Sequence, residues 1–291
     1  MKKILVHIPK LTANYLQALL YINNLLPPDY EIRVYIPREL SNKEKYRQKQ
    51  QHRERNIRFA IRNHDFLKIV NNKFINLLFG RFAKKYEEEK WLHIDNYFST
   101  PETEKLKFKI NALELNKLSQ IGPRIFIELI DEINNQENKI SEYSPDLFLM
   151  IGGPFVKKVI IKNLRTAINI HLGILPFYRG SKTIEWSLLN KDLQNVGVTI
   201  HFMNEEIDAG NSIRKIYFEE SVKNGVGFVH ARLFEMAFEQ IPDIIVKVVS
   251  SPLTLCLDIA PKNRISQSGY YYGYMFNAWH CFRLIKMCEK K

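Results

Sequence analysis

The pattern of hydrophobic and polar positions predicts strands and helices that alternate along the chain. Residues 3–8 (KILVHI) and 31–36 (EIRVYI) have the composition of strands, and the apolar spacing over residues 12–26 is that of a helix. The run LFLMIGG that starts at Leu147 is continuously apolar, which is typical of a strand buried on both faces. Further strands are predicted at residues 105–110, 167–171, 196–202 and 212–218.

Helices are predicted in the segments between these strands. They cover residues 155–163, 183–189 and 225–250, the last bent or broken at Pro242, and Gly122-Pro123 opens another through about residue 134. This alternation predicts an α/β fold, with a mainly parallel twisted sheet and helices on both faces in a Rossmann-like arrangement. A charged helical insertion is expected at about 38–90. We expect a main domain over 1–220, followed by a C-terminal helix and an aromatic-rich extension over 221–291.

Composition limits the class of protein. The chain has 291 residues and is 45% hydrophobic, which supports a sizeable core and excludes global disorder. No apolar run reaches the roughly 20 residues of a membrane span, and the apolar stretch after the first lysines is too short for a signal peptide. The three cysteines lack paired metal spacing and indicate a reducing compartment, so we expect a cytoplasmic protein without a bound metal.

About half of the net charge of +12 lies in one segment. Between Lys43 and Lys68 there are nine lysines and arginines against three acids. Such a segment is typical of a solvated or dimer-forming helix face. It is also consistent with a docking surface for an anionic partner such as a nucleotide, an acidic membrane surface or RNA. No zinc-finger spacing or aromatic RNA-binding signature is present, so no specific nucleic acid is predicted as a partner.

The stretch AINIHLGILPFYRG, residues 167–180, carries the first candidate chemistry. Asn169 and His171 are two residues apart in a strand, so their side chains share a face, while Ile168 and Ile170 point to the other face. A polar pair at the end of a strand in an α/β sheet lies where such folds usually place their active sites. The alternative is a hydrogen-bonded Asn beside a histidine at the edge of the core.

A third polar residue follows the next strand, VGVTIHF. Asp208 lies in the loop NEEIDAGNSI directly after that strand. If the two strands are parallel neighbours, Asp208 approaches the Asn169–His171 pair, although an Asp-Ala-Gly sequence alone is an ordinary turn.

Together these residues resemble the family of formyltransferases that use 10-formyltetrahydrofolate. The similar residues are the Asn-x-His-x-x-x-Leu-Pro corner with its Tyr-Arg-Gly turn, then Gly-Val-Thr-Ile-His, then Glu-x-Ile-Asp-Ala-Gly, in this order from about Ser144 to Ile213. The chain departs from the family pattern at Leu172-Gly173, after the histidine. The N-terminal half matches only in outline, because HIPKLTANY stands where the purine-pathway members have a Gly-Ser phosphate loop.

The resemblance implies a role for each matching residue. Asn169, His171 and Asp208 fall on the catalytic positions, and two loops fall where the family holds the pterin end of the folate. Those loops and their flank give the expected cosubstrate contacts Gly152, Gly153, Pro154, Phe155, Leu175, Glu205, Glu206 and Ile207. Contacts to the substrate are expected from Asn14, Tyr178, Arg179 and Gly180.

The residue types suit formyl transfer. A neutral amine attacks the formyl carbon, and the carboxamide NH₂ of Asn169 can donate to the oxygen that gains negative charge. His171 can manage a proton near neutral pH, and Asp208 can orient its imidazole. This chemistry needs no metal and no nucleophilic serine or cysteine.

The amine acceptor is less well determined by the sequence. A nucleotide-linked or lipid-linked amino sugar fits best, because the cationic surface suits a phosphate-bearing small molecule. The methionyl-tRNA branch remains an alternative that suits the basic charge, although its members carry a C-terminal barrel and much of the chain after Asp208 reads as helix. A non-catalytic basic binding module on the same fold is the other alternative. The sequence leaves open a homodimer and a peripheral membrane contact.

Overall fold

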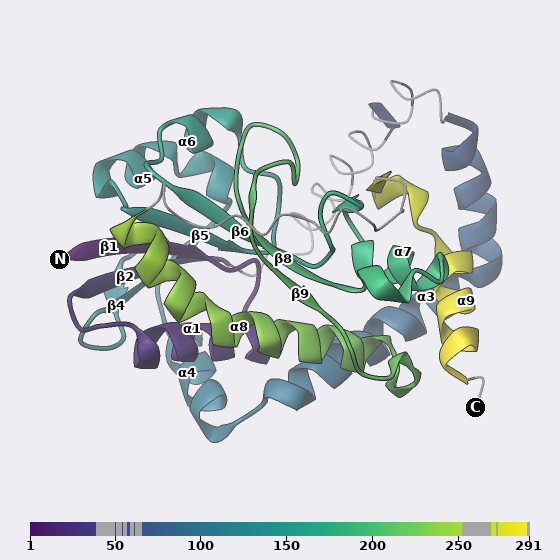
Figure 1. Cartoon of the computed structure of the whole chain (residues 1–291), viewed down its shortest axis with the longest axis horizontal. Helices are drawn as coiled ribbons and strands as arrows, with labels where there is room; N and C mark the ends of the chain where they lie inside the picture. Colours follow the sequence, from purple (N-terminus) through teal and green to yellow (C-terminus); the bar gives the residue numbers. More distant parts are fainter. Residues whose placement is uncertain are drawn as a thin grey trace.

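Eight strands form one twisted sheet at the centre of the molecule (Figure 1). The computed structural model describes residues 1–38, 50, 54, 57–58, 61, 66–251, 269–271 and 273–289. Within them the sheet has the order β3-β4-β2-β1-β5-β6-β8-β9. Its strands are β1 (Lys2–His7), β2 (Tyr30–Pro37), β3 (Ser119–Gln120), β4 (Ile125–Ile130), β5 (Leu147–Ile151), β6 (Ala167–His171), β8 (Gly197–Phe202) and β9 (Ser212–Tyr217).

Strands β4, β2, β1, β5 and β6 are parallel, whereas β3, β8 and β9 are antiparallel to their neighbours. A separate parallel pair joins β7 (Tyr178–Gly180) to β10 (Gly269–Tyr271). The sheet is therefore mainly parallel, as the sequence predicts, and its antiparallel side lies next to β6.

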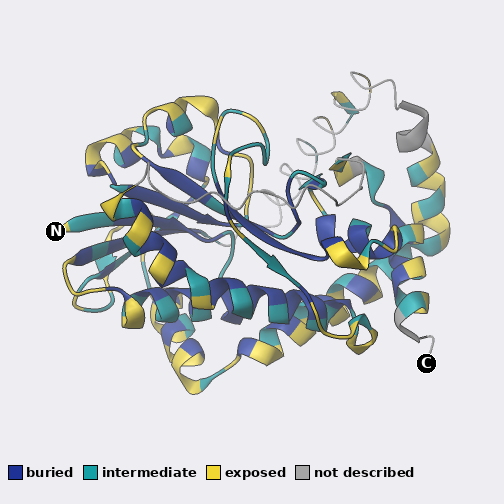
Figure 2. Ribbon diagram, in the orientation of Figure 1, coloured by how far each residue is buried: buried dark blue, intermediate teal, exposed yellow. Residues whose placement is uncertain are grey.

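Helices cover both faces of the sheet, which confirms the predicted fold class. Helices α5 (Glu137–Tyr143) and α6 (Lys158–Lys162) lie on one face, and α1 (Ala13–Leu25), α4 (Pro101–Asn111) and α8 (Val226–Ser250) on the other (Figure 1). The central strands are the most deeply buried part of the molecule (Figure 2). Short 3₁₀ turns complete the connections at Ile133–Asn135, Leu193–Asn195, Val222–Asn224 and Gly273–Met275.

Helix α3 (Phe66–Phe98) forms the described part of the predicted insertion. Its outer part packs on α9 (Ala278–Glu289) through aromatic rings, with centroid distances of 5.1 Å for Phe79–Trp279 and 4.9 Å for Phe82–Phe282. These rings of the C-terminal extension therefore pack on the protein itself. The basic segment Lys43–Lys68 lies for the most part outside the described residues, so its proposed roles stay predictions, as does the boundary at 220/221.

Two predicted elements are wrong. Residues 105–110 lie in helix α4, because Thr100 caps that helix by accepting a hydrogen bond from the Thr103 amide and Pro101 follows at the first turn. The helix predicted from Gly122 to about residue 134 is instead strand β4, whose residues pair in parallel with β2 from Ile125 onward.

Pro242 lies inside α8, which continues through it to Ser250. Residues 183–189 form helix α7 (Thr183–Leu189) with the predicted bounds.

Candidate active site

Asn169 and His171 lie side by side at the end of β6, in the middle of the sheet. Ile168 and Ile170 are 1% and 2% exposed and pack into the core on the face of α1 and α8. Asn169 and His171 therefore point to the opposite face, which they share with Ala167. The alternation that placed a carboxamide beside an imidazole is present as predicted.

The ring of His171 is held at both nitrogens. Nε2 lies 2.8 Å from the carbonyl oxygen of Tyr178, and Nδ1 lies 3.4 Å from Oδ2 of Asp208. Since a backbone carbonyl only accepts, Nε2 carries a hydrogen and Nδ1 is the nitrogen that can take up or release a proton. Burial lowers the pKa of His171, and the nearby Asp208 carboxylate opposes that shift.

Asp208 reaches this pair by a route that differs from the predicted one. Strand β8 runs antiparallel to β6, so it ends beside the start of β6, with Phe202 opposite Ile168. The loop after β8 then runs back along the strand to bring Asp208 to His171. Asp208 adopts a φ of 48°, in the left-handed region that Asp tolerates better than most residues. The predicted proximity is present, but its predicted parallel geometry is wrong.

The carboxylate of Asp208 is the charged centre of the site. It accepts a hydrogen bond from the Gly180 amide at 2.9 Å, and Oδ1 lies 3.6 Å from Nε2 of His201. Burial alone would raise the pKa of Asp208, but His171, His201 and the Gly180 amide outweigh it and hold the pKa at about 2. Asp208 is therefore ionised at neutral pH although only 11% of its side chain is exposed.

His201 is a member of the cluster that we did not predict. It pairs with Asn169 across the strands, and Nδ2 of Asn169 lies 3.2 Å from its Nε2. Nδ1 of His201 donates to the carbonyl of Phe202 at 2.8 Å, so Nε2 accepts from Asn169. This fixes the carboxamide, leaves its second N–H free, and leaves Oδ1 buried without a hydrogen-bond partner among the described residues.

Gly180 positions Asp208 because two segments meet at its backbone. Its φ is 95°, and a Cβ at this position would lie 2.4 Å from the carbonyl oxygen of Tyr271 in β10. Only glycine fits this contact between β7 and β10 without displacing one of them.

The residues expected to hold the folate lie in two loops beside the cluster. Gly152, Gly153, Pro154 and Phe155 connect β5 to α6, and Phe155 is 44% exposed. Glu205, Glu206 and Ile207 lie in the loop of Asp208. Lys162 and Lys158 of α6 form ion pairs with Glu205 at 3.1 and 3.5 Å, which joins the loop of Asp208 to that helix. Leu175 is buried, and its amide donates to the Thr199 hydroxyl.

The residues expected to contact the substrate already have partners within the protein. The Tyr178 hydroxyl donates to Asp192 at 2.9 Å, and Arg179 donates to the Tyr270 hydroxyl at 2.9 Å. Asn14 is fully buried in α1 and accepts from Thr12, while its Nδ2 has no partner among the described residues. Their role in substrate binding stays a prediction.

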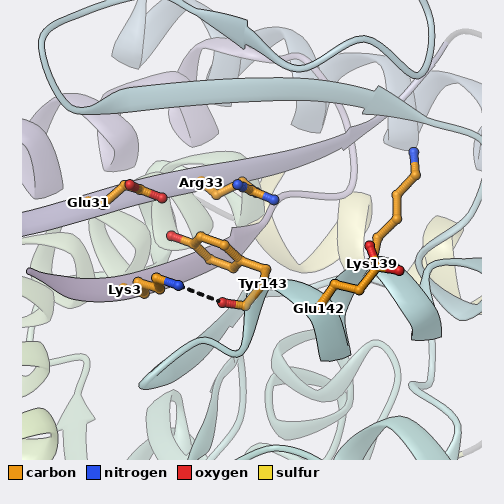
Figure 3. A pocket seen from close by; sticks show the side chains of 6 residues that line it. All are labelled: Lys3, Glu31, Arg33, Lys139, Glu142 and Tyr143. Carbon is orange, nitrogen blue, oxygen red and sulfur yellow. Dashed lines mark hydrogen bonds between the residues drawn. The ribbon is translucent and has the colours of Figure 1, made fainter.

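A separate pocket of about 350 Å³ lies near the amino ends of β1 and β2 and is lined by Lys3, Glu31, Arg33, Lys139, Glu142 and Tyr143 (Figure 3). The Arg33 guanidinium lies 3.8 Å from the centroid of the Tyr143 ring, and Lys3 donates to the Tyr143 carbonyl. This pocket is lined by residues of both charges, and none of its lining residues is a histidine or an asparagine, unlike those at the end of β6. Among the described residues no group of three His, Cys, Asp or Glu could hold a metal, and no helix there is long and apolar enough to cross a membrane.

Comparison with known proteins agrees with the geometry. Residues 131–245 match the family model described as Formyl transferase. A methionyl-tRNA formyltransferase of Desulforamulus reducens is 31% identical over 104 residues, which cover 35% of this chain and 32% of that protein. The enzyme of the same name from Buchnera aphidicola is 28% identical over 115 residues, 39% of this chain and 36% of that protein. The chain thus spans about a third of the length of these curated relatives.

Two solved structures share the fold over most of the chain. A sugar N-formyltransferase from Shewanella sp. FDAARGOS_354 superimposes with a TM-score of 0.52 at 14% identity and covers 94% of this chain and 76% of that one. A 4-N formyltransferase from Francisella tularensis gives a TM-score of 0.52 at 17% identity, with coverage of 94% and 78%. At this identity the similarity establishes the fold alone.

Proposed function

We propose, from the match of residues 131–245 to the family model described as Formyl transferase, that this chain transfers a formyl group from 10-formyltetrahydrofolate to a primary amine. The acceptor we propose is a nucleotide-linked or lipid-linked amino sugar. The observation that carries the proposal is the cluster of Asn169, His171, His201 and Asp208, in which an orphaned carboxamide oxygen lies beside an ionised carboxylate and a histidine.

Asn169 has the groups that the reaction needs at the formyl carbon. One N–H is held by His201, so the other can donate to the formyl oxygen as it gains negative charge. The unpartnered Oδ1 can accept an N–H of the attacking amine, which would orient its lone pair. A carboxamide held on one side by a neighbouring histidine loses little conformational freedom when it binds.

His171 and Asp208 can manage the proton. The attacking amine must lose a proton, and the departing nitrogen of the folate must gain one. Nδ1 of His171 can exchange a proton on the side that it shares with Asp208, because Nε2–H is occupied by the Tyr178 carbonyl. The low pKa of Asp208, about 2, keeps the carboxylate charged so that it can stabilise an imidazolium.

The residues around the cluster fit the formyl donor. When bound, 10-formyltetrahydrofolate supplies the formyl group. Gly152 and Gly153 have φ values of 65° and 120° and no side chains, so a planar ring can approach the backbone of this loop. Glu205, in the loop of Asp208, forms ion pairs with Lys158 and Lys162 of α6, so that loop lies beside the helix that follows the glycines.

The position of the positively charged Lys10 supports an acceptor that carries a negatively charged group. Lys10 follows the carboxyl end of β1, and its Nζ lies 3.0 Å from the centroid of the Trp91 ring. Burial, aided by the like charge of Lys90, lowers the pKa of Lys10 to about 8. No carboxylate forms an ion pair with Lys10 in the part of the chain that the structure describes. A phosphate is the group that such a cation would bind most favourably.

Strand order places the two anchoring residues on the same edge of the sheet. Asn169 lies in β6, and Lys10 follows β1, which is separated from β6 only by β5. An acceptor that contacts both residues would lie across the ends of these strands. A sugar ring that carries an amine on one side and a phosphate on the other suits such a position.

A methionyl-tRNA acceptor is the second candidate, because the curated relatives named above are methionyl-tRNA formyltransferases. The two candidates differ in where the acceptor's charge lies. An amino sugar phosphate needs one anion site near Lys10, whereas a tRNA would need an extended basic surface.

The test is direct detection of the product. Purified protein with 10-formyltetrahydrofolate is offered nucleotide-linked amino sugars and, separately, initiator methionyl-tRNA, and the gain of one carbonyl mass is followed by mass spectrometry. We expect an amino sugar to be formylated. Asn169→Ala, His171→Ala and Asp208→Ala should each lower kcat by about 10³-fold, and the melting temperature should change little in the first two variants.

The double variant Asn169→Ala/His171→Ala should lose far less than the product of the two single effects, because both groups act on one transition state. Near-normal turnover by His171→Ala would refute the proposed mechanism. Formylation of the tRNA alone would replace the amino sugar with the second candidate.

A further inference from the structure

A single row of paired residues crosses the sheet at the level of the site. In strand register, Tyr35 pairs with His7, His7 with Met150, Met150 with Asn169, and Asn169 with His201. Directly paired residues on neighbouring strands point to the same face. His7 therefore lies on the same face as Asn169, two strands away, in the floor of the proposed site.

His7 has an unused nitrogen at this position. The residue is 0% exposed, and Nδ1 lies 3.2 Å from the carbonyl oxygen of Tyr35, so Nδ1 donates. Nε2 is buried and has no hydrogen-bond partner within the described ranges. Burial lowers the pKa of His7 to about 4, so the ring is neutral at pH 7 and Nε2 presents a bare lone pair. An acceptor left unpaired in this way is destabilising unless something binds to it.

Glycine leaves room above this lone pair. Gly153 is exposed, and a Cβ placed on it would lie 3.4 Å from Nε2 of His7 and 3.0 Å from Cε of Met150. At the neighbouring Gly152 the corresponding position is 3.6 Å from the Tyr15 hydroxyl. An atom of a ligand that takes the place of the missing Gly153 side chain would meet Nε2 near hydrogen-bond distance once the Met150 side chain shifts by a few tenths of an ångström.

We propose that His7 is a specificity-determining residue that accepts a hydrogen bond from a hydroxyl group on the sugar ring of the acceptor. This inference rests on the function proposed above. The position of His7 favours a contact with the acceptor rather than with the folate. It lies on β1 between Lys10, which follows the same strand, and Asn169, two strands away. A sugar whose phosphate meets Lys10 and whose amine meets Asn169 passes over it.

The hydrogen bonding of His7 determines which kind of ligand group it can bind. A neutral imidazole with Nδ1–H engaged can only accept at Nε2, so it favours O–H or N–H groups and disfavours a carbonyl or a phosphate oxygen. A site built around a buried acceptor rejects the analogue that lacks the donor, because the acceptor then stays unpaired. His7 would therefore distinguish a hydroxylated amino sugar from its deoxy counterpart.

The test compares two variants by binding as well as by turnover. His7→Leu removes the acceptor, and His7→Gln offers a carbonyl oxygen near the position of Nε2. Calorimetry on the full chain uses a panel of nucleoside-diphosphate amino sugars, and then the deoxy form of the one that binds most tightly. Binding of 10-formyltetrahydrofolate is measured alongside as the matched control.

We expect His7→Leu to weaken binding of the hydroxylated sugar tenfold or more, and His7→Gln to weaken it less. The deoxy sugar should bind equally to the wild type and to His7→Leu, and folate affinity should stay within about threefold. Equal affinity of the hydroxylated sugar for the wild type and His7→Leu would overturn the inference, as would a panel in which no amino sugar binds. Sugar binding with the expected His7 dependence but without formylated product would refute the proposed function and leave this inference standing.

Discussion

Two buried clusters of charged and titratable groups in this molecule have similar compositions and different surroundings. The first is the site cluster of Asn169, His171, His201 and Asp208. The second, here called the helix junction, consists of Tyr86, Lys90, Glu185 and His230. In the helix junction Lys90 lies 2.9 Å from Glu185, the Tyr86 hydroxyl donates to Glu185 at 3.1 Å, and His230 lies 3.5 Å from it.

The two clusters differ in the structural elements and partners that hold their side chains. The helix junction joins three helices, α3, α7 and α8, and its charges face one another: Lys90 and Glu185 are 3% and 1% exposed, and Glu87 adds a second carboxylate 3.1 Å from Lys90. The site cluster lies at the end of a strand and under a loop, and it leaves Asn169 Oδ1 unpaired. The helix junction also holds a buried histidine without a hydrogen bond, since both ring nitrogens of His230 are unpaired among the described residues. Neither a buried histidine–carboxylate pair nor an unpaired atom therefore indicates catalysis by itself, and what separates the clusters is that one lies at a strand end and the other between helices.

The largest stability effect is expected at the helix junction. Glu185→Gln should destabilise the fold by about 3 kcal/mol, because it leaves the Lys90 ammonium buried with only Glu87 to balance it. Burial alone would raise the pKa of Glu185, but Lys90 and His230 outweigh it and hold the pKa well below its ordinary value. Urea denaturation followed by circular dichroism measures the loss.

The matching double variant, Lys90→Met/Glu185→Leu, sharpens the comparison. It should recover much of the lost stability, since replacing both partners of a buried pair with apolar groups is often close to neutral. Turnover per folded molecule should fall far less in Glu185→Gln than in Asp208→Ala. If both fell alike, the helix junction would belong to the reaction and the distinction drawn here would be lost.

A smaller effect with a defined pH window is expected at Asp208. Its pKa is about 2 in the folded protein against an ordinary 3.8, so its stabilising contribution is full above pH 4 and disappears as the pH falls to 2. Asp208→Asn should lower the free energy of unfolding by about 2 kcal/mol at pH 7, and the difference from wild type should vanish near pH 2.

Thermal melts at several pH values test this prediction. Asp29→Asn is a suitable control, because Asp29 is 55% exposed and lies 3.6 Å from Lys2 at the surface. A difference between Asp208→Asn and wild type that stays constant from pH 7 to pH 2 would show that the carboxylate contributes by shape and not by charge.

The smallest effect is expected at the exposed ion pairs of α3. Lys84–Glu88 and Lys85–Glu89 have N···O distances of 3.7 Å and side chains that are more than half exposed. Because water screens these charges, Lys84→Ala and Lys85→Ala should each change the unfolding free energy by less than about 0.5 kcal/mol. The same denaturation assay applies. Losses as large as that of Glu185→Gln would show that burial is not what separates the helix junction from the surface of the same helix.

The sequence predicted well what depends on neighbours along the chain. The face shared by Asn169 and His171 follows from strand alternation, and helix α7 follows from local spacing and turn residues. A strand is wrongly predicted at residues 105–110 because apolar and polar residues alternate there. The residue that indicates a helix, the cap at Thr100, lies outside this segment. Strand β4 was missed because its pairing with β2 depends on residues about 90 positions away.

The parts of the candidate site that were missed depend on pairing between strands. His201 and His7 look unremarkable within their own strands, and only the register brings them into the row of Asn169. The direction of β8 depends in the same way on contacts with β6 and β9, so the proximity of Asp208 could be inferred but its route could not. A sequence alone gives the face of a side chain more readily than its partner on the next strand.

Strand β10 gives the site a dependence on the order of synthesis. The carbonyl of Tyr271 accepts from the Ser181 amide at 2.8 Å and lies against Gly180, whose amide holds Asp208. These contacts join residues about 90 positions apart, so the later one leaves the ribosome well after β7. A nascent chain that has completed the whole sheet and α8 still lacks the segment that fixes β7. Folding of the sheet and assembly of the site are therefore separate events in time, and a chain cut after α8 should keep the first without completing the second.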